Sequence, residues 1–345
     1  VPIGVLGGLF APRLLSAMGG SAQLVETGHL YTRVLLGGST VILLLFLINA
    51  IFRGAGDAAI AMRVLWLANL VNLILDPCLI FGWGPFPALG VTGAAVATTT
   101  GRSVGVLFQL FTLARRHGRI VVRANHLQLH PSVMLRLMRL SVSGILQMLV
   151  GTTSWLGLIR ILSGFGSAVI AGYTIGIRLI IFAILPAFGM SNAAATMVGQ
   201  SLGAKNPDRA ERSVWIASFY NMLFLGAVSL GFIVFAPQLI SLFTRDPTVA
   251  RFAINCLRSV SVGFVFYGYG MVISQAFNGA GDTLTPTLLN LFCFWLWEIP
   301  IAYLLSHYTG LGANGVFFSI AIAFSTLAVL SIAIFRRGRW KQIVI

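Results

Sequence analysis

Two acidic residues lie within long apolar stretches, where an ionisable group is energetically unfavourable and therefore marks a candidate functional site. The first is Asp76, in the run NLVNLILDP, with Asn69 and Asn72 seven and four residues before it. On a helix this spacing places both carboxamides and the carboxylate on one face, where they can bind a proton or a small cation. The alternative is that Asp76 lies at the outer boundary of a membrane and only precedes the helix break at Pro77.

The second acid is Glu298, in the run FWLWEIP, two residues before Pro300. Proline leaves a backbone carbonyl of the preceding turn without its helical donor, so that this carbonyl can bind an ion or a polar group. An internal repeat with an offset of 222 residues aligns Glu298 with Asp76, which predicts an acid at the same depth in both halves. We interpret Asp76, Glu298, Asn69 and Asn72 as candidates for ion coupling or gating. A purely structural helix break is the alternative for Glu298.

Other polar residues lie on the predicted helices 132–163, 167–200 and 249–278 and are candidates for lining a substrate cavity. They are Gln147, Trp155, Tyr173, Arg178, Asn192 and Gln275. The alternative for each is an interhelical hydrogen bond, which contributes about 0.6–2 kcal/mol. The three cysteines and five histidines show no metal-ligand spacing, so we predict no metal site. No catalytic constellation is present, and the two GAGD turns lack the strand and the Lys-Ser/Thr pair of a phosphate-binding loop.

The elements that position these residues follow from the composition, which is 57% hydrophobic and 9% charged with a mean hydropathy of +0.92. These values predict an all-α, polytopic membrane protein, because a spanning helix needs about 20 apolar residues. After a partial helix at 1–15, the predicted spans are 29–52, 60–82, 90–114, 132–163, 167–200, 212–243, 249–278, 284–307 and 312–335.

The net charge of +15 is concentrated in alternate connections between the apolar segments, notably in residues 115–123 and 336–341. This distribution is the positive-inside pattern, which places those connections on the cytoplasmic side of the membrane. It argues against nucleic acid as a partner, because the arginines form no basic face with interleaved aromatic residues.

An internal repeat organises the chain. Residues 10–57 match residues 235–282 at a constant offset of 225, and after a small slip residues 89–93 match 311–315 at an offset of 222. A repeat of this kind in apolar sequence indicates two similar helix bundles, the architecture of many transporters. It predicts an N-terminal lobe at 1–116 with about three and a half helices, a cytoplasmic linker at 117–131 and a six-helix lobe at 132–345. The opening at Val1 then reads as the middle of a helix in an N-terminally truncated chain.

Four motifs follow one another along the chain: RGAGD at 53–57 with GAGD at 279–282, LDP at 75–77, GxxGAAxAT at 90–98, and MVGQSLGAKNPDRAERS at 197–213. In this order and spacing the chain resembles the multidrug and toxic compound extrusion (MATE) family. The resemblance implies two six-helix bundles, with helices one, two and part of three missing here. It also implies antiport, in which entering H⁺ or Na⁺ drives cationic, amphipathic compounds out of the cell.

The resemblance implies an acid on the helix that contains 141–160 in some members of the family, and on the helix that contains 267–271 in others. This sequence departs from the family there, because neither segment contains an acid. These departures favour H⁺ over Na⁺ as the coupling ion. We expect no cofactor beyond that ion, small molecules and membrane lipid as the partners, a monomer, and a location in the inner (plasma) membrane. A lipid-linked oligosaccharide flippase of related fold is the alternative function. It would need a strongly basic cavity, for which Arg102 and Arg178 are the main candidates.

Overall fold

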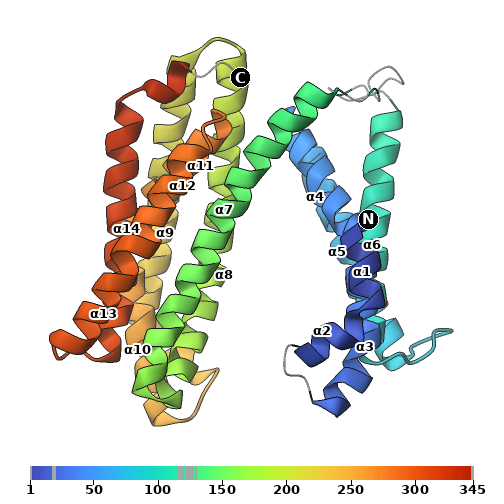
Figure 1. Ribbon diagram of the computed structural model, residues 1–345, viewed down its shortest axis with the longest axis horizontal. Coiled ribbons are helices and arrows are strands. Elements are labelled where there is room, and N and C mark those ends of the chain that lie inside the picture. The colour runs from blue at the N-terminus through green and yellow to red at the C-terminus, as the bar shows by residue number, and fades with distance from the viewer. Residues whose placement is uncertain (1, 18–20, 116–119, 121–127, 129, 343–345) are drawn as a thin grey trace. The chain divides into compact units, whose positions relative to one another are not determined.

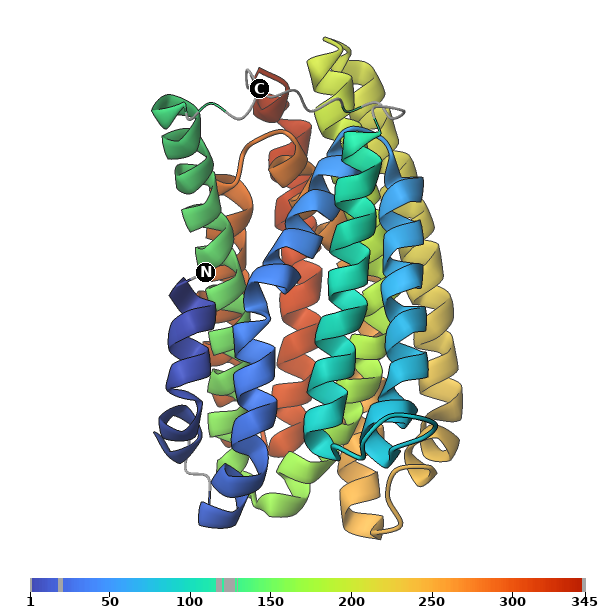
Figure 2. The same ribbon diagram turned by 90° about the vertical axis from the view of Figure 1, so that its right-hand side faces the viewer.

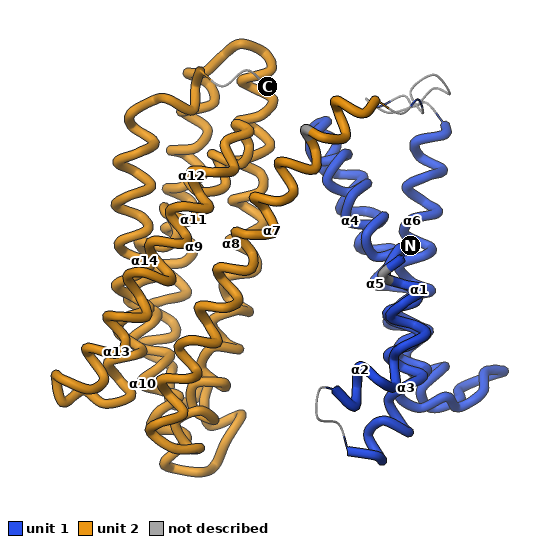
Figure 3. The backbone as a smooth tube through the Cα atoms, in the orientation of Figure 1, with its two compact units in different colours: residues 1–128 blue, residues 129–345 orange. Residues whose placement is uncertain are grey.

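The computed structural model describes residues 2–17, 21–115, 120, 128 and 130–342. The chain falls into two compact units, residues 1–128 and 129–345 (Figure 3). The linker predicted at 117–131 lies outside the described residues except for residues 120, 128, 130 and 131.

Unit 1 is entirely helical in its described part. It contains α1 (Pro2–Leu9), α2 (Ala11–Ala17), α3 (Ala22–Gly37), α4 (Ser39–Gly54), α5 (Ala58–Phe81) and α6 (Val91–Ala114). Helices α5 and α6 run side by side (Figure 2), and glycines of α6 allow this close approach. A β-carbon at Gly101, for example, would lie 2.6 Å from the carbonyl oxygen of Ala68 on α5.

Unit 2 is also helical throughout its described part (Figure 1). Its elements are α7 (Pro131–Leu162), the 3₁₀ turn η2 (Ser163–Phe165), α8 (Ser167–Gly203), α9 (Pro207–Ser241), α10 (Pro247–Val262), α11 (Phe264–Gly279), α12 (Leu284–Asn290), the π-helical turn η3 (Leu291–Trp297), α13 (Glu298–Tyr308), α14 (Ala313–Arg336) and the 3₁₀ helix η4 (Arg339–Gln342). Helices α8, α9, α10, α11 and α14 enclose the core, where Tyr173, Phe264 and Phe317 are fully buried.

Seven helical segments of the described chain are long and apolar enough to span a membrane, and α10 with α11 forms an eighth that is bent by 56°. The predicted span 90–114 is the helix α6, but it is not among these segments. Its hydroxyl residues Thr98, Thr99 and Thr100, together with Arg102, lower its hydropathy.

Two of the predicted spans are interrupted where the sequence suggested continuous helices. The span predicted at 29–52 is the pair α3 and α4, which meet at Gly38, and the span predicted at 249–278 is the bent pair α10 and α11, which meet at Gly263. A β-carbon at Gly38 would lie 2.6 Å from Thr99 of α6, and one at Gly263 would lie 2.8 Å from Ala321 of α14. Both breaks therefore lie where glycine lets a neighbouring helix approach.

The helix bounds confirm the repeat. Helices α3 and α4 become α10 and α11 when 225 is added to each residue number, and α6 becomes α14 when 222 is added. The change of offset falls between these helices, in α5 and the loop that follows it.

Packing contacts show where the change falls, and they correct the alignment of the two acids. Gly93 of α6 packs against the backbone of Leu79 in α5, and its repeat mate Gly315 packs against the backbone of Leu305 in α13. Leu79 and Leu305 are 226 residues apart, so the C-terminal part of α5 and α13 match at 226 rather than at 222. Relative to unit 1, the π-helical turn of unit 2 contains one additional residue, which raises the offset from 225 to 226. The loop 309–312 is shorter than its counterpart in unit 1, which lowers the offset by four to 222. Glu298 therefore corresponds to Asn72, and the predicted pairing of Glu298 with Asp76 was wrong by one helical turn.

Candidate functional site

The polar stripe predicted on α5 forms only in part. The side-chain N–H₂ of Asn72 donates to Asp76 Oδ1 at 3.2 Å and to Thr98 Oγ1 of α6 at 3.3 Å. All three residues are half-buried. Asn69 is exposed and does not join this cluster. The result is a carboxylate that has a carboxamide donor beside it and that remains within reach of solvent.

Glu298 lies in a very different environment. Its side chain is 3% exposed, and it is the only buried acid among the described residues. Ser154 Oγ of α7 donates to Glu298 Oε2 at 3.4 Å. Glu298 opens α13 directly after the π-helical turn. Pro300 explains that turn, because its ring cannot fit against the carbonyl of a regular preceding turn and the widened helix relieves the clash.

The Glu298 cavity has a volume of about 220 Å³ and is lined mainly by aromatic and aliphatic side chains. Tyr267 stacks on Phe324 with ring centroids 4.0 Å apart, and Phe294 meets Phe324 edge to face at 6.4 Å. Two predicted residues, Trp155 and Tyr173, also line this cavity; the other members are Gly151, Ser154, Leu158, Ile177 and Ile320.

Tyr173 contributes an unusual group to the Glu298 cavity. Its side chain is 1% exposed, and its buried hydroxyl, which lies beside the Trp155 indole, forms no well-aligned hydrogen bond among the described residues. A buried hydroxyl that is poorly paired is unfavourable, and a bound ligand or water that completes its hydrogen bonding would relieve this.

A second cavity of about 380 Å³ adjoins the first, because both are lined by Gly151, Tyr267 and Phe294. Its polar lining is a set of carboxamides: Asn278 Nδ2 donates to Gln275 Oε1 at 2.6 Å and to Gln147 Oε1 at 3.2 Å. The Nε2 atom of Gln147 is buried and has no partner among the described residues. Gln147 and Gln275, both predicted, thus lie together, next to the Glu298 cavity.

The combined space can recognise an amphipathic cation. A carboxylate and aromatic faces both attract a positive charge. The carboxamides of the second cavity can hydrogen-bond polar groups of a larger molecule, and the apolar walls bury its hydrocarbon. Among the described residues, no group of three or more His, Cys, Asp or Glu side chains is arranged to hold a metal ion.

The chain is similar to known proteins in both sequence and fold. The sequence profile described as MatE matches residues 1–78 and 141–304. The chain belongs to the MatE family. It is 27% identical to "Probable multidrug resistance protein YoeA" of Bacillus subtilis over 99% of this chain and 74% of that protein. It is 29% identical to "Probable multidrug resistance protein NorM" of Thermotoga maritima over 90% of this chain and 67% of that protein. A crystal structure of MATE in the bent conformation superposes with a TM-score of 0.89 at 28% identity, covering 99% of this chain and 75% of that one.

The chain is therefore a membrane protein of the MATE multidrug efflux transporter family, built from helices as the sequence predicted. The remaining two cavity candidates of this MATE protein, Arg178 and Asn192 on α8, are exposed and line neither of the two cavities described above. Their role in substrate binding stays a prediction.

Sequence reasoning missed several residues of the MATE cavity, chiefly Tyr267, Phe294 and Phe324. Phe294 could have been found, because it lies four residues before Glu298 and hence on the same helix face. Tyr267 and Phe324 come from α11 and α14, and nothing in their spacing relates them to Glu298. Thr98 belongs to the GxxGAAxAT motif, but its contact with Asn72 depends on how α6 packs on α5.

Proposed function

We propose that this MATE protein is a secondary active antiporter that exports cationic, amphipathic compounds in exchange for protons by alternating access. The observation that carries the proposal is the buried carboxylate of Glu298, which faces an aromatic cavity and has Ser154 as its hydrogen-bond donor. No other described acid combines burial with a cavity.

A carboxylate in an apolar site is unstable without a partner for its charge. It therefore binds either a proton or the cationic group of a substrate, and each excludes the other. Arrival of a cation releases the proton, and arrival of a proton releases the cation. This competition couples the exit of the cation to the entry of a proton, as antiport requires, and it needs no cofactor and no chemical change in the substrate.

A proton suits both acids better than Na⁺ does. Hard cations require several oxygen ligands. Near Glu298 the described hydrogen-bond contact is a single serine hydroxyl, and near Asp76 the Asn72 N–H₂ group already occupies the space between the carboxylate and Thr98. The proposal therefore includes H⁺ as the coupling ion, with Asp76 as a second, solvent-accessible proton site.

The flippase alternative is not favoured, because a pyrophosphate head group needs a basic cavity. Neither cavity of unit 2 described above is lined by arginine, and the buried charge there is an acid. The proposal further includes a monomer in the plasma membrane that acts on small molecules and has lipid as its surroundings.

The test measures binding of the lipophilic cation tetraphenylphosphonium to the purified full-length protein, together with the protons released on binding. We expect about one proton released per cation bound by the wild type, because the two compete for one carboxylate. Glu298→Gln should bind the cation about 30-fold more weakly and release no proton, since losing a charged partner corresponds to about 2 kcal/mol.

Glu26→Gln is the matched control, because it makes the same chemical change at an exposed position. It should behave as the wild type. Unchanged affinity and unchanged proton release in Glu298→Gln would rule out the proposed exchange site.

A further inference from the structure

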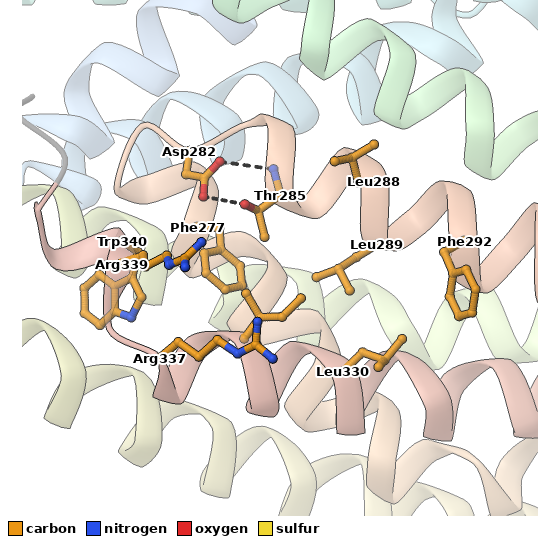
Figure 4. Close-up of a pocket in the computed structure, with 11 residues that line it drawn as sticks. Phe277, Asp282, Thr285, Leu288, Leu289, Phe292, Leu330, Arg337, Arg339 and Trp340 are labelled. Carbon is orange, nitrogen blue, oxygen red and sulfur yellow. Dashed lines mark hydrogen bonds between the residues drawn. The ribbon is translucent and has the colours of Figure 1, made fainter.

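A third cavity lies at the end of unit 2 that carries the C-terminal arginines (Figure 4). It has a volume of about 360 Å³ and lies between the turn that joins α11 to α12 and the end of α14. One part of its lining is apolar and comes from Leu288, Leu289, Phe292, Leu330 and Ile334. The other part is charged, with Arg337 and Arg339 directed into the same space.

The two arginines form none of the ion pairs found among the described residues. Both of those pairs belong to Lys341, which contacts Glu211 and Asp208 of α9. The cavity does contain one acid, Asp282, but its two oxygens accept hydrogen bonds from the backbone N and the Oγ1 of Thr285 at 3.1 and 2.6 Å. Asp282 thus caps α12. With two arginines and one aspartate, the cavity lining carries a net charge of +1.

The backbone holds Arg339 in place. Gly338 adopts a left-handed conformation with φ +72°, which turns the chain back over the end of α14. Trp340 then lies buried, stacks on Phe335 with centroids 4.6 Å apart, and donates from Nε1 to the Phe335 carbonyl at 3.0 Å. Lys341 connects η4 to α9 through its ion pair with Glu211. The hydrogen bond to Glu211 raises the pKa of Lys341, so that the ammonium group stays charged.

The position of the cavity indicates what fills it. Leu288 and Phe292 are 55% and 41% exposed on a helix of a predicted membrane span, so that the apolar part of the groove opens toward hydrocarbon. The arginines lie past the last turn of α14, at the level of the membrane surface. Basic pockets between spanning helices at this level attract anionic lipid head groups. Arginine is suited to this role, because its planar guanidinium pairs with two phosphate oxygens at once.

We propose that this groove binds an anionic phospholipid, with the phosphate between Arg337 and Arg339 and an acyl chain along Leu288, Phe292 and Leu330. The site is separate from the Glu298 cavity and does not depend on the transport mechanism.

The experiment is native mass spectrometry of the purified full-length protein titrated with phosphatidylglycerol, with phosphatidylcholine, and with glycerol 3-phosphate. We expect tight phosphatidylglycerol adducts in the wild type and about 30-fold weaker binding in the double variant Arg337→Gln/Arg339→Gln, at about fivefold for each lost arginine. The matched control is Arg209→Gln/Arg212→Gln, which removes the same charge from exposed positions at the same end of unit 2. It should retain wild-type binding.

A third variant, Leu330→Trp, keeps both arginines and fills the apolar groove. It should weaken phosphatidylglycerol binding while leaving any weak glycerol 3-phosphate binding unchanged. Equal binding of phosphatidylcholine, equal losses in the two double variants, or glycerol 3-phosphate binding as tight as that of the lipid would each overturn the proposal. The melting temperature of every variant in detergent verifies that it is folded.

Discussion

Asp76 in unit 1 and Glu298 in unit 2 are acids on the helices that follow the two GAGD turns, yet their surroundings are opposite. Asp76 is half-buried beside the N–H₂ of Asn72, which also binds Thr98. Glu298 is buried in an aromatic cavity beside one serine hydroxyl. In the matched register Glu298 takes the place of Asn72, and Ile320 takes the place of Thr98.

The difference shows how one repeated scaffold can carry two kinds of acid. A carboxylate with a carboxamide donor and access to water is stable when ionised. A carboxylate among aromatic rings is stable only with a proton or a cation. We therefore expect unit 2 to discriminate among charged ligands more strongly than unit 1 does, and the following predictions test that expectation.

The largest expected effect is on transport itself. Glu298→Gln should lower proton-driven efflux of a cationic dye about 100-fold, whereas Asp76→Asn should lower it about tenfold. The reason is that water can replace part of the role of the half-buried Asp76 carboxylate but cannot reach the buried Glu298 carboxylate. Efflux is measured in vesicles and normalised to folded protein in the membrane. Equal losses in the two variants would contradict the contrast between the two acids, and unchanged efflux in both would remove them from the mechanism.

The second prediction concerns the register on which the comparison rests. Gly93→Val and Gly315→Val should each destabilise the protein by about 3 kcal/mol, because each side chain would meet the backbone of the neighbouring helix. Thermal unfolding in detergent measures the effect. Gly189→Ala on α8 is the control, since a β-carbon there meets nothing within 4 Å. A variant pair in which only one substitution destabilises would show that the two glycines are not equivalent.

The third prediction addresses the aromatic walls of the Glu298 cavity. Phe324→Leu removes the ring that stacks on Tyr267 and keeps an apolar side chain of similar size. The affinity for tetraphenylphosphonium should fall about fivefold, which corresponds to a cation–π contribution of about 1 kcal/mol. Binding of an uncharged apolar dye serves as the control and should be little changed. A parallel loss for both ligands would indicate a change in cavity shape rather than in charge recognition.

The smallest expected effect comes from making unit 2 resemble unit 1. Ile320→Thr places a hydroxyl at the position that corresponds to Thr98, where it can donate to Glu298. The added hydrogen bond stabilises the carboxylate when no cation is bound. The affinity for tetraphenylphosphonium should therefore fall about threefold, as expected for one hydrogen bond of about 0.6 kcal/mol. Ile320→Val, measured in the same binding assay, controls for lost volume. Tighter binding by Ile320→Thr would contradict this account of the two acids.

Much of the fold could be predicted from the sequence. The predicted helices 60–82, 90–114, 132–163 and 167–200 differ by at most three residues from α5, α6, α7 and α8. Apolar length and glycine-rich turns determine these bounds locally. The breaks at Gly38 and Gly263 were not predicted, because they depend on how closely α6 and α14 approach those glycines.

The candidate site was predictable only in its most polar members. Glu298, Trp155 and Tyr173 meet in one cavity, and Gln147 and Gln275 meet in the next. Asn69 is exposed and does not join the Asp76 cluster although its spacing fits the stripe, and the two acids occupy different positions in the repeat.

The sequence by itself determined that this protein is a helical membrane protein with an internal repeat and a small number of acids in apolar surroundings. Those properties follow from composition and spacing, which act over one or two helical turns. Only the tertiary structure decided which acid is buried, which aromatic rings surround it, and that a π-helical turn shifts Glu298 to the position of Asn72. These outcomes depend on contacts between helices far apart in the chain, because burial and hydrogen bonding are set by the neighbours that packing supplies.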